Sequence, residues 1–378
     1  MTTTDPDIHP LRWLTLVHTP GLGPAGANRL LKACGGIEEL WAADRQQLLE
    51  TGVRPSVVED LLKRSGLNSA RRELAGARKE KLHILTQDDP LFPPLLREIN
   101  DPPLLLYGRG ELETLTRPNL ALVGARAASS YGLKMAERLG AELAAAGITV
   151  VSGGAMGIDG AAHRGALSAR DGKTVAVLGC GLDQLYPPQN KKLFAMIAAT
   201  GMLLGEYPPG IRPEPFRFPA RNRIISGMSV GAVVIEAARR SGSLITAEMA
   251  MEQGREVFAV PGRADSGKSE GCHRLIQEGA RLVQRAEDIL SELRLNPLIA
   301  MGAASEPAAS MEHKGEGEHA AQDRESAALL AALDEYPRAI EEIIAACGLP
   351  AWKVNALLLE LEIAGRVEME SGPKYKKS

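Results

Sequence analysis

Aromatic side chains make up only 4% of this sequence of 378 residues, and neither charge sign is in large excess. Binding nucleic acid by stacking bases over a broad surface requires many rings, so the composition favours contacts to a phosphate backbone. The formal net charge at pH 7 is −3, which excludes a basic coat over the whole molecule. Any binding of DNA or RNA must therefore come from a local basic patch.

Cysteines and long apolar runs are scarce too. Cys34, Cys180, Cys272 and Cys347 lie far apart and form no CxxC pair, which argues against a zinc site or a disulfide framework. Such isolated thiols are typical of a reducing compartment. No run approaches the roughly 18 apolar residues of a membrane span, and residues 1–10 hold no apolar signal core. We expect a soluble cytoplasmic protein without membrane contact, metal or cofactor.

The chain is too long for one compact domain, and its pattern changes three times. Residues 1–75 are predicted to form a helical module of the helix–hairpin–helix or SAM-like type. Residues 76–294 alternate strand and helix, residues 295–323 form a flexible linker, and residues 324–378 form a winged helix. We find no internal repeat.

The middle segment predicts an α/β fold. Its predicted strands are 120–123, 148–151, 174–178, 232–235 and 257–260, and its predicted helices include 131–146, 158–169 and 244–253. Continuous apolar strands that alternate with helices indicate a doubly wound parallel sheet covered on both faces. In the last segment, helical patterns at 327–336, 340–347 and 352–364 precede a possible hairpin at 367–377, an order typical of a winged helix.

Arginines gather in residues 216–226, where Arg217, Arg221 and Arg223 occur without a carboxylate among them. Such a cluster repels itself unless an anion neutralises it, so we predict that Arg221 and Arg223 pair with phosphates. Asn222 is predicted to orient these arginines or to bond to a sugar or base. The sequence thus indicates a phosphate-binding surface.

Glycine-rich turns follow the first two strands of this sheet. Gly124 and Arg126 come directly after one strand, and Gly153, Gly154 and Gly157 follow the next. Ligands of doubly wound folds bind at strand ends, where glycine lets a phosphate approach and a helix N-terminus attracts it. The alternatives are an ordinary turn with a solvated arginine and tight packing of strand against helix.

Further polar residues leave more than one interpretation open. The lysines of residues 179–192 are either a solvated face or an extension of the phosphate track through Asn190 and Lys191. Asp159 and His163 share one helix face, but no third ligand is evident, so capping or packing is favoured over a metal. The spacing of Glu236 and Glu248 does not establish an acid/base pair.

Two formal motif matches fail their context tests. Residues 21–26 fit GxGxxG, but no strand precedes them, so a helix–hairpin–helix turn is the better interpretation. Residues 262–269 fit the Walker A pattern and follow a strand. However, no later apolar strand ending in aspartate supplies the metal carboxylate, which argues against an ATPase.

Several stretches together resemble the DNA processing protein A (DprA/Smf) family over most of residues 8–290. The resemblance is carried by residues 103–110, 123–132, 152–163, 181–187, 218–226, 241–247 and 260–262. It implies an extended Rossmann core that binds single-stranded DNA without sequence preference, loads the RecA recombinase during natural transformation, and catalyses no reaction. It also implies a homodimer whose surface lies near residues 271–283, with Leu275 and Ile276 as candidates.

Three other functions remain open at this point. A nucleoside-monophosphate phosphoribohydrolase would use a related core, but residues 241–248 lack the paired glycines of its PGGxGTxxE loop. A P-loop ATPase would use the stretch at 262–269. The winged helix could bind duplex DNA through Lys374, Lys376 and Lys377, although Glu360 and Glu362 on its predicted recognition helix oppose this.

Overall fold

The computed structural model describes residues 7–294 and, beyond them, residues 329, 332–333, 338–347, 354, 357–358, 361, 366–370 and 374–377. The described residues up to 294 belong to one compact unit, and those from 329 onward belong to another. The linker predicted at 295–323 lies outside the described residues.

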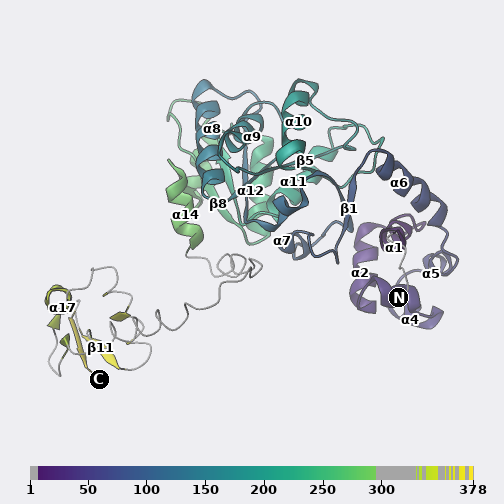
Figure 1. Cartoon of the computed structure of the whole chain (residues 1–378), viewed down its shortest axis with the longest axis horizontal. Coiled ribbons are helices and arrows are strands. Elements are labelled where there is room, and N and C mark those ends of the chain that lie inside the picture. Colours follow the sequence, from purple (N-terminus) through teal and green to yellow (C-terminus); the bar gives the residue numbers. More distant parts are fainter. Residues whose placement is uncertain are drawn as a thin grey trace. The chain divides into compact units, whose positions relative to one another are not determined.

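Short helices form the N-terminal part of the first unit (Figure 1). They are α1 (Ile8–Val17), α2 (Pro24–Cys34), α3 (Ile37–Ala42), α4 (Arg45–Glu50), α5 (Pro55–Leu62) and α6 (Leu67–Lys79). Proline begins α2 and α5, where no backbone N–H is needed, and Gly35 ends α2 with a φ of 94°, which favours glycine. The boundary predicted between residues 75 and 76 falls inside α6.

A nine-stranded sheet forms the centre of this unit, with the strand order β1-β2-β6-β5-β4-β3-β7-β8-β9. The strands are β1 (His83–Thr86), β2 (Leu105–Gly110), β3 (Asn119–Gly124), β4 (Thr149–Ser152), β5 (Thr174–Leu178), β6 (Met202–Gly205), β7 (Gly231–Ile235), β8 (Glu256–Ala259) and β9 (Arg281–Leu282). From β6 to β9 all neighbours are parallel, whereas β1 and β2 pair antiparallel at one edge. The predicted strands are thus confirmed, because buried parallel strands read as unbroken apolar runs.

Helices cover both faces of the sheet, as predicted. These elements are α7 (Pro94–Arg97), α8 (Ser130–Ala145), α9 (Ile158–Ser168), α10 (Lys191–Thr200), α11 (Arg217–Gly227), α12 (Gly242–Glu252), α13 (Glu270–Gln277) and α14 (Ala286–Arg294), with 3₁₀ turns η1 (Leu112–Thr116) and η2 (Pro188–Asn190). Helices α8, α9 and α14 share one apolar core with β3, β4, β7 and β8, and α11, α12 and α13 share the core on the opposite face. The fold is a doubly wound, Rossmann-like sheet extended by β1 and β2.

The strand order places a crevice between β3 and β7. From β3 the chain moves outward through β4, β5 and β6, and it then returns to the other side of β3 as β7. Gly124, which ends β3, pairs in register with Ile235, which ends β7. In open sheets of this kind, ligands bind outside the carboxyl ends of the strands where the order reverses. The turns that follow β3 and β7 therefore border the expected site.

The second unit contains a small sheet and one described helix. The sheet has the order β10-β12-β11, from strands β10 (Arg338–Ala339), β11 (Val367–Glu370) and β12 (Lys374–Lys377), and the helix is α17 (Ile340–Cys347). The antiparallel pairing of β11 with β12 confirms the predicted hairpin. Leu329, Ile343, Leu358 and Val367 are among its buried apolar residues. The helices predicted at 327–336 and 352–364 lie largely outside the described residues.

Candidate nucleic-acid interface

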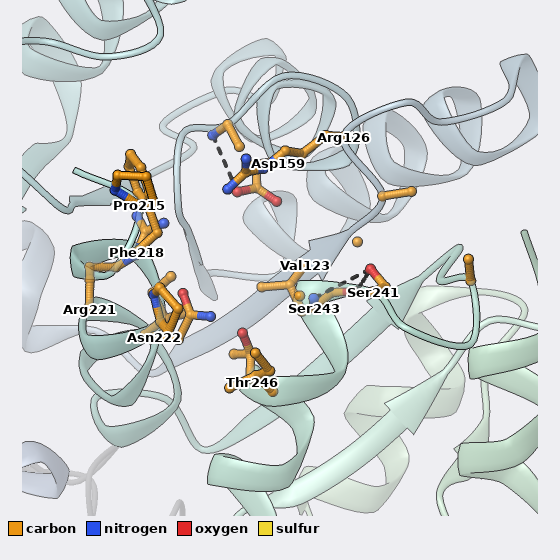
Figure 2. A pocket seen from close by; sticks show the side chains of 18 of the residues that line it. Val123, Arg126, Asp159, Pro215, Phe218, Arg221, Asn222, Ser241, Ser243 and Thr246 are labelled. Carbon is orange, nitrogen blue, oxygen red and sulfur yellow. Dashed lines mark hydrogen bonds between the residues drawn. The ribbon is translucent and has the colours of Figure 1, made fainter. Parts of the chain in front are cut away.

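A cavity of about 610 Å³ opens at the carboxyl ends of β3 and β7 (Figure 2). Its lining comes from the turn after β3, the first turn of α9, helix α11 and the start of α12. Its lining residues include Arg126, Asp159, Phe218, Arg221, Asn222 and Ser241. The structure thus brings together the turns after β3 and β4 and the arginine-rich helix α11, as the sequence predicted.

Arg126 is the exposed cation of this cavity. Its guanidinium lies 5.6 Å from the centre of the Phe218 ring, a cation–π geometry. No carboxylate of the described residues lies within salt-bridge distance of it. The backbone below is held closely: a side chain on Gly124 would lie 2.0 Å from the carbonyl oxygen of Ile235. Arg126 is therefore a charge presented to solvent from a rigid turn.

The glycines after β4 serve internal packing. Gly157 precedes α9 with a φ of 80°, and a side chain there would lie 2.3 Å from the Ala125 carbonyl. A side chain on Gly154 would meet Phe194 at 2.6 Å, and one on Gly153 would meet the Arg221 guanidinium at 2.6 Å. For these positions the alternative of tight packing explains the glycines. Their predicted role in DNA binding stays a prediction.

The arginines of α11 have partners that the sequence did not reveal. Arg223 is paired with Asp101 at 3.0 Å and with Glu206 at 2.6 Å. Arg221 is 5% exposed and donates from Nη1 to the carbonyls of Gly153 and Val177. The expectation that this cluster needs an external anion is therefore wrong, because the fold brings carboxylates and carbonyls to it from distant segments.

Burial also shifts the pKa values of Arg221 and of Asp159 beside it. Burial lowers the pKa of Arg221 to about 10, although the negative charge of Asp159 opposes this, so the guanidinium stays charged at neutral pH. Burial raises the pKa of Asp159, while Arg221 and hydrogen bonds from Ala155 and Gly153 act in the other direction. The Arg221 Nε atom, also buried, has no acceptor among the described residues.

Asn190 and Lys191 have different surroundings. Asn190 is buried, and its side-chain amide donates to the carbonyls of Gly154 at 2.9 Å and Ala155 at 3.1 Å. We therefore correct the predicted contact of Asn190 with DNA: its side chain instead supports the loop after β4. Lys191 is exposed at the start of α10. Asn222 is half-buried and lines the cavity.

The members of the candidate metal pair and of the candidate acid/base pair contact different partners. His163 is fully buried, its Nδ1 lies 2.7 Å from the Thr174 hydroxyl, and burial lowers its pKa to about 3. In the described part of the chain, no three His, Cys, Asp or Glu side chains are arranged to hold a metal ion. Glu236 is buried against Ser129, whereas Glu248 lies 3.8 Å from Arg274 on the surface of α12.

The Walker-like stretch does follow a strand and precede α13, but its lysine is engaged elsewhere. Lys268 Nζ donates to the carbonyl of Ala127 at 2.9 Å and lies 3.9 Å from the Glu236 carboxylate. A P-loop lysine instead reaches toward the phosphates of a nucleotide. This geometry supports the rejection of the ATPase interpretation.

Two contributions to the cavity were not predicted from the sequence. Phe218 and Tyr186 form a ring pair with centroids 5.7 Å apart beside Arg126, so aromatic residues gather here despite their low overall content. Ser241 caps α12 and its hydroxyl lies 2.8 Å from that of Ser243, which places a helix N-terminus at the cavity (Figure 2). The serine pair before an apolar helix was the signal that could have revealed this cap.

The candidates for a dimer surface also need correction. Leu275 is 2% exposed and belongs to the core beneath α13, so its side chain is not available to a second copy. Ile276 is partly buried against the same core. Leu282, on β9, is 48% exposed.

The fold and the cavity define a Rossmann-like protein of the extended, doubly wound type with a winged helix. Residues 83–294 match the family model of DNA recombination-mediator protein A, and residues 314–372 match that of the DprA winged helix domain. The chain belongs to the DNA recombination-mediator protein A family. Among the described residues, no helix is sufficiently long and apolar to span a bilayer.

Relatives and solved structures agree with this assignment. The chain is 36% identical to Protein Smf of Synechocystis sp., covering 97% of this chain and 98% of that protein. It is 51% identical to DNA processing protein DprA of Streptococcus pneumoniae over 54% of this chain and 72% of that protein. The X-ray structure of S. pneumoniae DprA superposes with a TM-score of 0.66 at 40% identity, covering 74% of this chain and 97% of that one. A Helicobacter pylori DNA processing protein A, whose structure concerns its single-stranded DNA binding mode, gives a TM-score of 0.52 at 30% identity, covering 57% and 96%.

Proposed function

We propose that this protein binds single-stranded DNA at the cavity between β3 and β7 and acts as a recombination mediator. The observation that carries the proposal is Arg126, an exposed cation without a carboxylate partner in the described part of the chain, at the edge of a cavity that also holds the N-terminus of α12. A phosphate is the anion that such an arrangement favours. The single-stranded DNA binding described for the H. pylori protein supports the same ligand class.

The parts of the site have different roles in this proposal. Arg126 pairs with one phosphate, and the exposed Lys191 binds the phosphate backbone further along the strand. Phe218 and Tyr186 offer a surface on which one base can stack. Arg221 and Asn190 bond to the backbone of the loop after β4 and hold it in place. The protein would therefore combine backbone contacts with limited stacking, which gives binding without strong sequence preference.

The test is a fluorescence-anisotropy titration of labelled oligothymidylate at several salt concentrations. We expect Arg126→Ala to weaken binding and to flatten the salt dependence by about 0.7, the contribution of one phosphate contact on a single strand. Arg170→Ala is the matched control, because Arg170 is 98% exposed and precedes β5 at the opposite end of the sheet. Equal affinity and equal slope for the wild type and Arg126→Ala would refute the site.

The partners follow from the same family membership and remain part of the proposal. We propose that the bound strand is passed to the RecA recombinase during DNA uptake, that the protein works as a homodimer in the cytoplasm, and that it performs no catalysis. RecA ATPase activity on single-stranded DNA, measured with and without this protein, tests the loading step. Release of adenine from AMP, or ATP turnover lost in Lys268→Ala, would instead support one of the enzyme alternatives.

A further inference from the structure

The turn that carries Arg126 is held at both ends by Glu236. This residue follows β7 directly and has a φ of 59°, a strained value for a residue other than glycine. Its carbonyl accepts a hydrogen bond from the Ala125 N–H at 2.8 Å. Its carboxylate accepts from the Ser129 N–H at 2.9 Å and from the Ser129 hydroxyl. Arg126 thus lies between two residues bonded to the same glutamate.

Lys268 holds the middle of this turn. Its Nζ atom donates to the Ala127 carbonyl at 2.9 Å and lies 3.9 Å from the Glu236 carboxylate. The Lys268 side chain is 51% exposed and that of Glu236 is 6% exposed, so the lysine closes over a buried acid. Backbone groups of residues 125, 127 and 129 are therefore all fixed from outside the turn.

We infer that Glu236 and Lys268 are positioning residues that fix the turn of residues 125–129, so that Arg126 is placed for a DNA phosphate. Neither residue needs to touch the DNA. A turn that is already rigid loses less conformational entropy when DNA binds. The affinity for DNA is higher as a result. The inference rests on the proposed function and gives a role to the lysine of the Walker-like stretch.

Replacing Glu236 tests the inference, because a purely electrostatic role and a positioning role would change the affinity for DNA in opposite directions. If Glu236 acted only through its field, Glu236→Gln would remove a negative charge near the phosphate and strengthen binding. If it positions Arg126, the same substitution weakens oligothymidylate binding, by about tenfold for the loss of one charge-assisted hydrogen-bond network. Stronger or unchanged binding by a folded Glu236→Gln protein contradicts the inference.

Lys268 provides a second test that does not depend on a buried residue. The oligothymidylate salt titration compares Lys268→Met, Arg126→Ala and the double variant. The charge-matched control is Lys63→Met, at the exposed residue that directly follows α5. A positioning lysine acts through Arg126, so the double variant should match Arg126→Ala in affinity and in slope. A lysine that contacts phosphate itself would instead lower the slope by a further 0.7 or so, which would overturn the inference.

The two proposals fail in different ways. If Arg126→Ala binds like the wild type, the proposed site is wrong and the inference fails with it. If Arg126→Ala weakens binding but Lys268→Met leaves it unchanged or adds a separate loss, only the positioning role is wrong. Thermal unfolding of each variant confirms that the comparison is between folded proteins.

Discussion

The guanidinium of Arg221, in α11, donates a hydrogen bond to the carbonyl oxygen of Gly153 over 2.8 Å. The bond joins the arginine-rich helix to the loop after β4, although the two residues are 68 positions apart in the chain. The same Nη1 atom also donates to the Val177 carbonyl at the end of β5. Arg221, which lines the cavity, is thus bonded to the backbone of two neighbouring segments.

We therefore predict that Arg221→Ala lowers the free energy of unfolding by about 3–5 kcal/mol, the usual cost of removing one member of a buried charged group. The substitution leaves two buried carbonyls without their donor and Asp159 without the nearest compensating charge. Urea denaturation measures the change. Arg126→Ala, at an exposed position, should stay within about 0.5 kcal/mol of the wild type. Equal stability of the two variants would contradict this division of roles.

His163 should make the fold sensitive to acid. Its pKa is lowered from 6.5 to about 3 in the folded state, mainly by burial and further by the charges of Arg221 and Arg164. Below about pH 6.5 the unfolded chain binds a proton at this residue that the folded protein does not bind. Stability should then fall with decreasing pH by up to about 1.4 kcal/mol per unit, until the pH reaches about 3.

The measurement is urea denaturation of the wild type and His163→Asn between pH 7 and pH 4. Asparagine keeps a polar atom near the Thr174 hydroxyl but cannot be protonated in this range. Because the pKa of Asp159 is raised by burial, its contribution has the opposite sign, but it is common to both proteins and cancels in the difference. A difference in stability that does not change with pH would show that His163 is not the cause.

Local patterns predicted the fold well. Apolar runs such as 174–178 became buried parallel strands, since such strands are apolar on both faces. The glycine turns after β3 and β4 were predicted at the site because strand ends of a parallel sheet share one edge. What local patterns could not show were partners from distant segments. Glu206 and Asp101 neutralise Arg223, and neither lies near it in the sequence.

The low aromatic content of the whole chain also gave no sign of the ring pair at this cavity. Composition averages over the whole chain, whereas the fold places Phe218 and Tyr186 together beside Arg126. We predict that Phe218→Leu weakens oligothymidylate binding by about 1–3 kcal/mol, the usual contribution of one stacked base.

An oligonucleotide with abasic sites tests this role of Phe218 directly. The wild type should bind the abasic strand more weakly than oligothymidylate, and Phe218→Leu should bind both strands equally. The salt slope should not change, because phenylalanine carries no charge. A variant that still prefers the strand with bases would show that stacking occurs elsewhere.

The edge of the sheet at β9 gives the last prediction. β9 is the final strand in the order, and a strand edge with an exposed apolar side chain favours pairing with another chain. Leu282, in β9, is 48% exposed, and Ile276 lies on the neighbouring helix α13. If the homodimer forms here, Leu282→Glu should give the mass of a monomer in size-exclusion chromatography with light scattering, because it buries a charge in the interface.

Two further substitutions separate this surface from general effects of an added charge. Leu62→Glu, on α5, changes a leucine of similar exposure, 44%, and should leave the oligomeric state unchanged. Leu275→Glu should lower the thermal midpoint, because that side chain is 2% exposed and packs in the core. If the wild type has the mass of a dimer and Leu282→Glu keeps that mass, the interface lies on another face, and Ile276 would then lose its predicted role with it.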